Sequence, residues 1–428
     1  MNTLSICIEK RNTPFMSLLR RGSAKRALGS VTVFILTIAF LECALWVVST
    51  RSSAIRALLS DTQPLLPDPV LGFRLNPDVP GIDKAGYRNA SVAESPYLVA
   101  LGDSQTYGAN VGREEAWPQQ LAALSGKPIY NMGVPDYGPV QELVLTPHAI
   151  TLRPQWVVVG FYSGNDLCDA YDMVYTRKQI TDLRSDDQSV ISTIENAEKV
   201  RPFQQAAEGS FRALAGNFGP IGTLTRVREF LSKHSRLWGT LRAAWRIVMK
   251  KTVHTVSPDV LWSEQAGLAR KSGGAWVPFE KKGVKTIFTP QVRFLALNIE
   301  DPRIHEGFRV SVESIKRMSS ITQNAGMRFM VVMIPTKERV FFDTFGGNAD
   351  GTPRAVTELA DQEQEMLTEL KNELRVSGIS YVDVLPALRE SLSGGESPYP
   401  VSADGHPNAR GHKAIAAAVW RAMATTER

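Results

Sequence analysis

Four short segments of this sequence carry side chains suited to nucleophilic catalysis. The first, LVALGDSQTYG at residues 98–108, is an apolar run that ends in Gly102 and Asp103 and then delivers Ser104. A serine at the carboxyl end of a strand in an open α/β sheet projects into the crevice where such folds bind ligands. Gly102 permits a sharp turn there, and the N–H groups that follow can face an oxyanion. Gly-Asp-Ser also occurs in ordinary turns, so Ser104 needs partners elsewhere in the chain.

The segment ADGHPNARGH, near the C-terminus, offers those partners. It places Asp404 and His406 just ahead of a final helical pattern. Residues i and i+2 of an extended chain point to the same side, so Asp404 can bond one imidazole nitrogen and leave the other for Ser104. The imidazole then takes the serine proton, and the carboxylate fixes the tautomer and stabilises the imidazolium. The alternative is that Asp404 caps the helix and His406 lies on the surface. His412, inside that helix, is expected to be a packing or surface residue.

Two segments between these supply candidate donors for an oxyanion. YNMGVPDYG puts Gly133 in a turn after a short apolar run, and GFYSGND puts Asn165 after a strand-like run. A glycine N–H and an asparagine amide both suit a developing negative charge. Each segment is common as a turn. The chain order Ser, Gly, Asn, His, with each residue near a predicted strand or helix end, is specific.

These four segments resemble the blocks of the SGNH (GDSL-like) hydrolase superfamily. The resemblance covers residues 97–166 and 307–424 and implies a flavodoxin-like sheet with a Ser104, His406, Asp404 triad. It also implies an oxyanion hole formed by the Ser104 and Gly133 N–H groups with the Asn165 side chain. Further segments are similar to membrane-anchored SGNH proteins of bacterial envelopes: DPVLGFRLNP (68–77), GYRN (86–89) and IPTKE (334–338).

One departure from the family pattern concerns the acid of the triad. Many members place Asp three residues before His, whereas Asp404 stands two before His406. The shorter spacing resembles the branch that includes alginate-type O-acetyltransferases, and it favours acyl transfer over hydrolysis.

The elements that must position these residues follow from hydrophobic patterning. Short β-rich runs occur at Tyr97–Leu101, Trp156–Tyr162, Arg328–Ile334 and Ser380–Val384. Runs such as WVVVGFY are apolar on both faces, as in a parallel sheet covered by helices, so the sequence predicts a three-layer α/β fold. Helical periodicity is found at Trp117–Ser125, Pro139–Leu152, Gly307–Ala325, Glu358–Val376 and Asn408–Ala424.

The domain plan has four parts. Residues 1–26 form a basic cytoplasmic segment, 27–50 a transmembrane signal anchor, and 51–95 a linker and cover segment. Residues 96–428 form the SGNH-like domain, with a largely helical insertion at about 173–302 whose basic helices face water or contact a membrane surface or an anionic polymer.

The anchor rests on an apolar run between Arg26 and Arg51 whose only ionisable groups are Glu42 and Cys43. A helix of this length spans a hydrocarbon core of about 30 Å. The basic residues before it place the N-terminus in the cytoplasm. The expected location is therefore a single pass through a bacterial inner membrane, with the catalytic domain facing the periplasm or cell exterior. A cleaved signal peptide is the competing interpretation. Glu42 either reaches the interface or binds a partner helix.

Composition, charge and cysteine spacing exclude several other classes of protein and kinds of site. The 428 residues are 43% hydrophobic and 21% charged, which is typical of a globular protein. The net charge of +6 comes without a nucleic-acid motif. Three cysteines show no disulfide framework or metal-ligand spacing, and Cys168 is expected to be structural. No phosphate loop or dinucleotide fingerprint is present, so neither a cofactor nor a metal is predicted.

The sequence thus predicts a serine esterase that acts on acyl esters, O-acetyl esters foremost, of an extracytoplasmic glycan or related substrate. The first alternative is an O-acyltransferase that modifies an envelope or exported polysaccharide. The resemblance implies a membrane protein partner that brings its acyl donor. The second alternative is a non-catalytic glycan-binding scaffold on the same fold.

Overall fold

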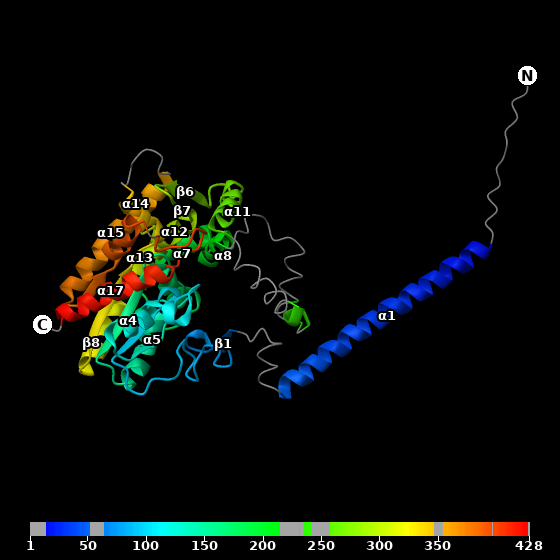
Figure 1. Ribbon diagram of the computed structural model, residues 1–428, viewed down its shortest axis with the longest axis horizontal. Helices are drawn as coiled ribbons and strands as arrows, with labels where there is room; N and C mark the ends of the chain where they lie inside the picture. The colour runs from blue at the N-terminus through cyan, green and yellow to red at the C-terminus, as the bar shows by residue number, and fades with distance from the viewer. Residues whose placement is uncertain are drawn as a thin grey trace, which may run out of the picture. The chain divides into compact units, whose positions relative to one another are not determined.

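The computed structural model describes residues 14–51, 64–214, 231, 235, 237–241, 257–345, 354–395 and 397–426 (Figure 1). The chain divides into two compact units, residues 1–63 with 221–251 and residues 64–220 with 252–428. The second unit contains the four segments singled out above. The predicted insertion at 173–302 is therefore shared between the units, since its central part groups with the N-terminal residues.

A five-stranded sheet forms the centre of the second unit, in the order β4-β3-β5-β8-β9 with every neighbouring pair parallel. Every residue of β5 is buried, and every residue of β8 except Arg328. The four predicted strands are confirmed with ends shifted by at most one residue, and β4 is an addition. The strands are β3 (Leu98–Gly102), β4 (Ile129–Asn131), β5 (Trp156–Tyr162), β8 (Arg328–Ile334) and β9 (Ser380–Asp383).

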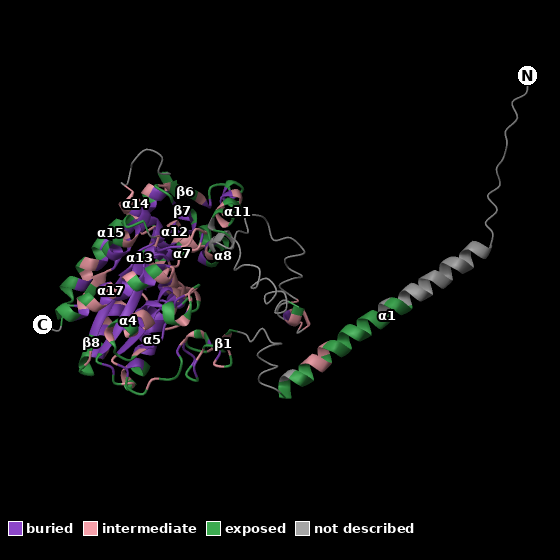
Figure 2. Ribbon diagram, viewed as in Figure 1, coloured by how far each residue is buried: buried purple, intermediate pink, exposed green. Residues whose placement is uncertain are grey.

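Helices cover both faces of this sheet, which confirms the three-layer α/β prediction. Alternate residues of β3 and β5 enter two separate apolar clusters, with Val99 in one and Leu98 in the other. The sheet is accordingly buried between green and pink outer helices in Figure 2. Helices that contribute to the first cluster are α5 (Pro139–Thr151), α13 (Pro302–Asn324) and α15 (Arg354–Val376). Helices that contribute to the second are α4 (Trp117–Ser125), α14 (Lys337–Thr344), α16 (Leu385–Ser393) and α17 (Ala409–Thr426).

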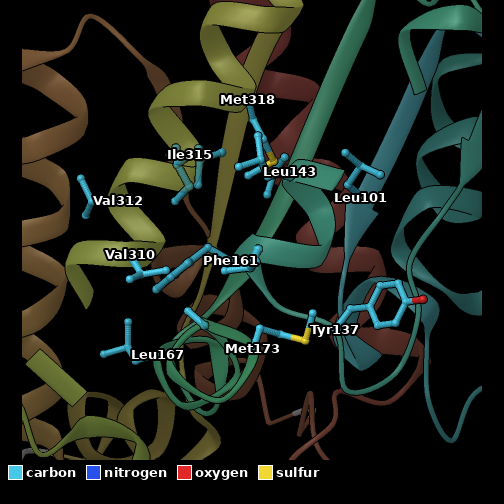
Figure 3. Packing of buried hydrophobic residues seen from close by; sticks show 14 of the residues in the cluster. Leu101, Tyr137, Leu143, Phe161, Leu167, Met173, Val310, Val312, Ile315 and Met318 are labelled. Atoms are coloured by element: carbon cyan, nitrogen blue, oxygen red, sulfur yellow. The ribbon is translucent and has the colours of Figure 1, made fainter. Parts of the chain in front are cut away.

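The first cluster fixes α5 and α13 against the strands. Ile315 and Met318 on α13 are fully buried, and Figure 3 shows them beside Leu143 of α5 and Phe161 of β5. Burying such a side chain stabilises the fold by about 1.5–3 kcal/mol. This packing holds the carboxyl ends of β3 and β5, where the candidate residues begin, in a fixed relation.

Smaller elements surround this core. The cover segment forms an antiparallel hairpin of β1 (Leu65–Asp68) and β2 (Gly72–Leu75). After β5 the chain turns through α6 (Asp166–Tyr171), η2 (Asp172–Thr176) and η3 (Thr181–Leu183). The insertion is not wholly helical, because it holds an antiparallel hairpin as well. Its elements are α7 (Gln188–Val200), α8 (Phe203–Leu214), α11 (Pro258–Arg270), β6 (Val277–Lys281), β7 (Val284–Phe288) and α12 (Pro290–Leu297).

The first unit contains the long helix α1 (Pro14–Arg51), which includes the predicted anchor at 27–50. Over the described part of the chain, no helix is long and apolar enough to cross a membrane. The anchor is thus not confirmed and stays a prediction from the sequence. Parts of the basic and linker segments, 1–13 and 52–63, lie outside the described residues.

Glu42 on α1 has partners within the same unit. Its carboxylate accepts a hydrogen bond from the Ser235 hydroxyl and another, at 3.2 Å, from the Leu237 N–H. The sequence left open whether this side chain faces an interface or a partner. In the structure it contacts the chain's own residues.

Candidate active site

Ser104 begins the short helix α3 (Ser104–Tyr107), directly after β3. Asp103 caps this helix, because its carboxylate accepts the N–H of Gln105 at 2.8 Å. Gly102 has φ +151°, and a Cβ at this position would lie 2.1 Å from Thr106 Oγ1. The turn therefore requires glycine, as the sequence predicted. Ser104 supplies the first N–H of the helix, which has no carbonyl within the helix to bond.

The structure brings Ser104, His406 and Asp404 into one hydrogen-bonded chain. His406 Nε2 lies 2.8 Å from Ser104 Oγ, and His406 Nδ1 lies 2.6 Å from Asp404 Oδ1. These partners assign the tautomer, with Nδ1–H donating to the carboxylate and Nε2 accepting from the hydroxyl. Asp404 Oδ1 also accepts the His406 backbone N–H at 3.0 Å. The two-residue spacing between acid and base is therefore compatible with a triad.

The charge state of Asp404 fits this arrangement. Burial alone would raise its pKa, but the hydrogen bonds from His406, together with the charge that His406 carries when protonated, outweigh burial and leave the pKa below its ordinary value. The other carboxylate oxygen, Oδ2, accepts a hydrogen bond from the Asn110 side chain. An ionised Asp404 can thus stabilise an imidazolium at His406.

Lys337, from the IPTKE segment, holds the loop that carries Asp404. Its side chain is fully buried, and its ammonium donates to the carbonyl oxygens of Ile287, Ser402 and Asp404 at 2.7–3.0 Å. Burial lowers the pKa of Lys337 to about 8, so the group remains mainly protonated at neutral pH. Lys337 is a positioning residue for the loop.

The GYRN segment contacts α3, the short helix that begins with Ser104. Arg88 donates to the carbonyl oxygens of Tyr107 and Gly108, which end α3. Asn89 accepts the N–H of Asn131 at 3.0 Å and donates to its carbonyl at 2.9 Å. The segment therefore joins α3 to the end of β4.

The prediction that the Gly133 N–H forms part of the oxyanion hole needs a correction. This N–H donates to Asn131 Oδ1 at 2.9 Å, so the donor is already used within the turn. A Cβ on Gly133 would lie 2.5 Å from the Tyr107 N atom. This position is glycine because the turn packs closely against α3. Sequence patterning cannot show that competition for the N–H.

Asp136, three residues later in the same turn, is the residue that the sequence analysis missed. It has φ +62°, a left-handed conformation that is uncommon outside glycine. No described residue accepts a hydrogen bond from its N–H. Burial raises the pKa of its carboxyl, while the charges of His406 and Arg177 oppose the rise. Among the described residues, the Asp136 N–H is therefore left without an acceptor. The turn residues of YNMGVPDYG were the signal that the sequence offered.

Asn165 lies at the end of the GND turn, before α6. Its Nδ2 donates to Asp169 Oδ2 at 2.7 Å, and its Oδ1 is buried without a partner among the described residues. The amide has a second N–H, which is available to an oxyanion. Burial, followed by the charge of Asp136, raises the pKa of Asp169 well above its ordinary value.

A cavity of about 540 Å³ adjoins Asn165 and Asp136. Its wall comes from the cover hairpin, from α6 and η2, and from two helices of the insertion, α8 and α12. Cys168, expected to be structural, is one of its lining residues, and its thiol approaches the Leu295 carbonyl oxygen at 3.7 Å. The volume lies within the usual range for small-molecule sites.

Arg293 on α12 connects the insertion to the candidate site. It is nearly buried and donates to the Gly164 carbonyl oxygen at 3.2 Å. A Cβ on Gly405, between Asp404 and His406, would lie 2.5 Å from Arg293 Nη2. The guanidinium therefore contacts both loops that carry candidate residues. Sequence reasoning placed residue 293 in an unrelated insertion, and no motif marks it.

Three buried carboxyls lie beneath these loops: Asp103, Glu142 and Asp166. Burial raises the pKa of Asp103 to about 6. Burial and the charge of Asp103 also raise the pKa values of Glu142 and Asp166 well above the ordinary ones. Within the described ranges, neither oxygen of Glu142 has a hydrogen-bond partner.

Two further expectations concern metals and His412. No group of three or more His, Cys, Asp or Glu side chains in the described part of the chain is arranged to hold a metal ion. His412 is fully buried and accepts the Trp117 N–H at 3.2 Å, so it is a packing residue. Burial lowers its pKa to about 3.

Comparisons with known proteins give matches to solved structures alone. No family model and no curated protein matches this chain. A GDSL-like lipase from Bacteroides thetaiotaomicron is 10% identical over 77% of this chain and 88% of its own, with a TM-score of 0.32. An acetyl-xylooligosaccharide esterase variant from Geobacillus is 10% identical over 78% and 96%, with a TM-score of 0.33.

An extracellular lipase from Streptomyces rimosus is 13% identical over 76% of this chain and 98% of its own, with a TM-score of 0.29. GDSL-type hydrolases are thus among the structures that match, and this is the family that the four sequence segments resemble.

Proposed function

We propose that this chain is a serine-dependent hydrolase of acyl esters. The proposal is carried by one observation, the continuous hydrogen-bonded chain from Ser104 Oγ through His406 to Asp404, with distances of 2.8 and 2.6 Å. A hydroxyl, an imidazole and a carboxylate in this order are the parts that activate a serine for attack on a carbonyl. Ser104 lies 302 residues from His406 in the sequence, and folding brings the two side chains within hydrogen-bond distance.

The reaction has two halves. Ser104 Oγ attacks the ester carbonyl carbon, and its proton passes to His406 Nε2 while Asp404 stabilises the imidazolium. His406 then protonates the departing alcohol, which leaves an acyl group on Ser104. In the second half His406 takes a proton from water, and the resulting attack on the acyl carbonyl releases the acid and restores the hydroxyl.

The negative charge on the carbonyl oxygen needs donors. The N–H groups of Ser104 and Asp136 and the second N–H of Asn165 are the candidates. Removing one such donor typically slows acyl transfer about 100- to 1,000-fold. Asp136 here takes the place that the sequence analysis gave to Gly133.

The test uses the full-length protein purified in mild detergent. We expect it to hydrolyse p-nitrophenyl acetate and to react covalently with a fluorophosphonate at Ser104. Ser104→Ala should abolish both, and His406→Ala should reduce turnover by about 10³- to 10⁶-fold. An exposed serine, Ser91→Ala, serves as the matched control and should leave both unchanged. A folded wild-type protein that neither labels nor turns over any ester would support the scaffold alternative and overturn the proposal.

Acyl transfer is the second candidate, supported by the short Asp404–His406 spacing. It shares the first half-reaction, and a sugar hydroxyl then replaces water as the attacking group. Adding oligosaccharide acceptors to the ester assay separates the two functions. Acylated sugar as the main product would support a transferase, whereas free acid alone would support a hydrolase.

The glycan substrate, the membrane-bound acyl-donor partner and the extracytoplasmic location are proposals supported by the sequence alone. The location rests on the apolar run at 27–50 after a basic segment. The glycan substrate rests on this location and on the four segments that resemble SGNH proteins, and the acyl-donor partner is implied by that resemblance. A reporter fused after residue 428 tests the orientation, since alkaline phosphatase is active outside the cytoplasm. Activity confined to a cytoplasmic reporter would contradict the location.

A further inference from the structure

The wall of the cavity beside Asn165 is mainly apolar, with polar side chains at its Asn165 end and at its rim. Phe203, Val292 and Ala296 in its wall are almost fully buried. At the rim, Arg177 and Asp172 form an ion pair at 2.6 Å, and Gln204 and Glu208 are exposed. Such a space accepts an apolar group from a polar entrance.

The position of the cavity decides which part of an ester reaches it. The departing alcohol oxygen must lie next to His406 Nε2, because His406 supplies its proton. The carbonyl oxygen must face the donors of Ser104, Asp136 and Asn165. The remaining substituent on the carbonyl carbon is the acyl chain. Asn165 and Asp136 line the cavity, whereas neither Ser104 nor His406 does. The cavity therefore borders the site on the side of Asn165 and Asp136 and not on the side of the base, where the alcohol leaves.

We propose that this cavity, walled by α8 and α12 of the insertion, binds the acyl group of the substrate and selects chains longer than acetyl. This inference rests on the proposed function. A single methyl group would leave most of the 540 Å³ unfilled. Each methylene that an apolar wall buries favours binding about fourfold. The substrate class therefore changes from the O-acetyl esters expected from the sequence to esters of medium-length acyl chains.

The inference also gives the insertion a purpose. α8 supplies Phe203 and Ala207 to the wall, and α12 supplies Val292, Leu295 and Ala296. Arg293, on the same helix, contacts the loop of Gly164 and thereby holds this wall against the candidate site.

The experiment measures kcat/KM for p-nitrophenyl acetate, butanoate and octanoate with the full-length protein. We expect the wild-type protein to prefer octanoate over acetate by about tenfold or more. Ala207→Trp places an indole in the cavity and should reduce the octanoate-to-acetate ratio by about tenfold or more. Gln205→Trp is the matched control, because Gln205 lies on the same helix, is exposed and does not line the cavity. It should change the ratio by less than about twofold.

Each outcome is decisive. A wild-type preference for acetate, with the ratio unchanged in Ala207→Trp, would overturn the acyl assignment and leave the esterase proposal intact. A raised KM for acetylated sugars in Ala207→Trp, with no change in chain-length ratio, would place the alcohol part in the cavity and also overturn it. A wild-type protein that neither hydrolyses any ester nor reacts with a fluorophosphonate would remove the proposed function itself. Should Ala207→Trp fail to fold, Ala207→Leu makes the same comparison with a smaller side chain.

Discussion

The loops at the carboxyl edge of the sheet and the helices of the insertion are built in different ways. The loops that carry Ser104, Asn165 and His406 are held by buried polar contacts, among them two hydrogen bonds from Lys337 to the carbonyl oxygens of Ser402 and Asp404. The insertion helices α8 and α12 meet the same region mainly through apolar side chains such as Phe203 and Val292. Hydrogen bonds therefore fix the positions of side chains in the loops, whereas the apolar side chains of the insertion helices form the wall of the cavity.

The two regions also differ in how they affect the stability of the fold. Beneath the loops lie the fully buried carboxyls of Asp103, Glu142 and Asp166, and Asp136 adopts a left-handed backbone. Such features destabilise a protein and gather where function requires them. The apolar wall from α8 and α12 follows ordinary packing rules. Under the proposed function, the loops set the reaction geometry and the insertion selects the acyl group.

The largest effect on kcat is expected at Asp404, which determines which nitrogen of His406 carries the proton. Asp404→Asn keeps the shape of the side chain but removes the carboxylate that fixes the His406 tautomer. We expect kcat for ester hydrolysis to fall about 10⁴-fold with the fold unchanged. The exposed Asp186→Asn is the matched control. Turnover of Asp404→Asn within tenfold of wild type would show that Asp404 is not the acid of the triad.

An intermediate effect is expected at the contact between the two regions. Arg293→Met keeps an apolar stem but removes the hydrogen bond to the Gly164 carbonyl oxygen. Because hydrogen bonds to charged groups contribute about 1.5–3 kcal/mol, kcat should fall about 10- to 100-fold, with KM changed less. Arg270→Met, an exposed arginine of the insertion, should have no effect. A change in KM alone would make Arg293 a binding residue and not a positioning residue.

A smaller effect is expected on thermal stability, where the buried carboxyl of Glu142 destabilises the fold at neutral pH. The pKa of Glu142 is raised above the ordinary 4.5, so above that pH the unfolded chain loses this proton while the folded protein keeps it. Stability contributed by the protonated group therefore falls by about 1.4 kcal/mol per pH unit between the two pKa values. Glu142→Gln should raise Tm at pH 7.5 and leave it unchanged near pH 4.

The exposed Glu94→Gln serves as the control for that series and should shift Tm at neither pH. Thermal unfolding of the three proteins across this pH range makes the comparison. A Tm for Glu142→Gln that follows the wild-type value at every pH would mean that Glu142 carries no such cost.

The smallest effect concerns the backbone of Asp136. A φ of +62° disfavours a residue with a side chain by about 1–2 kcal/mol, and replacing Asp136 by glycine removes this penalty. The larger conformational entropy of glycine in the unfolded chain cancels part of the stability gained. We expect Asp136→Gly to raise stability by about 0.5 kcal/mol and to retain activity, since the proposed donor is the backbone N–H. Asp136→Ala keeps the strain and should be less stable than Asp136→Gly. Loss of activity in Asp136→Gly would assign the function to the carboxylate.

Much of this protein was predictable from local patterns. Strands β3, β5, β8 and β9 follow from short apolar runs, because parallel strands buried on both faces need apolar residues throughout. Ser104, His406 and Asp404 were singled out by local features, a strand-to-helix turn and a two-residue spacing, and their catalytic role stays a prediction. The geometry adds that these three side chains meet.

The tertiary structure alone decided which donors are free and what shapes the cavity. Gly133 looked suitable in sequence, but its N–H bonds to Asn131 Oδ1, and only a folded turn reveals that competition. Arg293 reaches Gly164 from 129 residues away because α12 packs beside the loops. Residue types and short spacings are fixed by the sequence itself, whereas hydrogen-bond partners and cavity walls depend on which distant segments packing brings together.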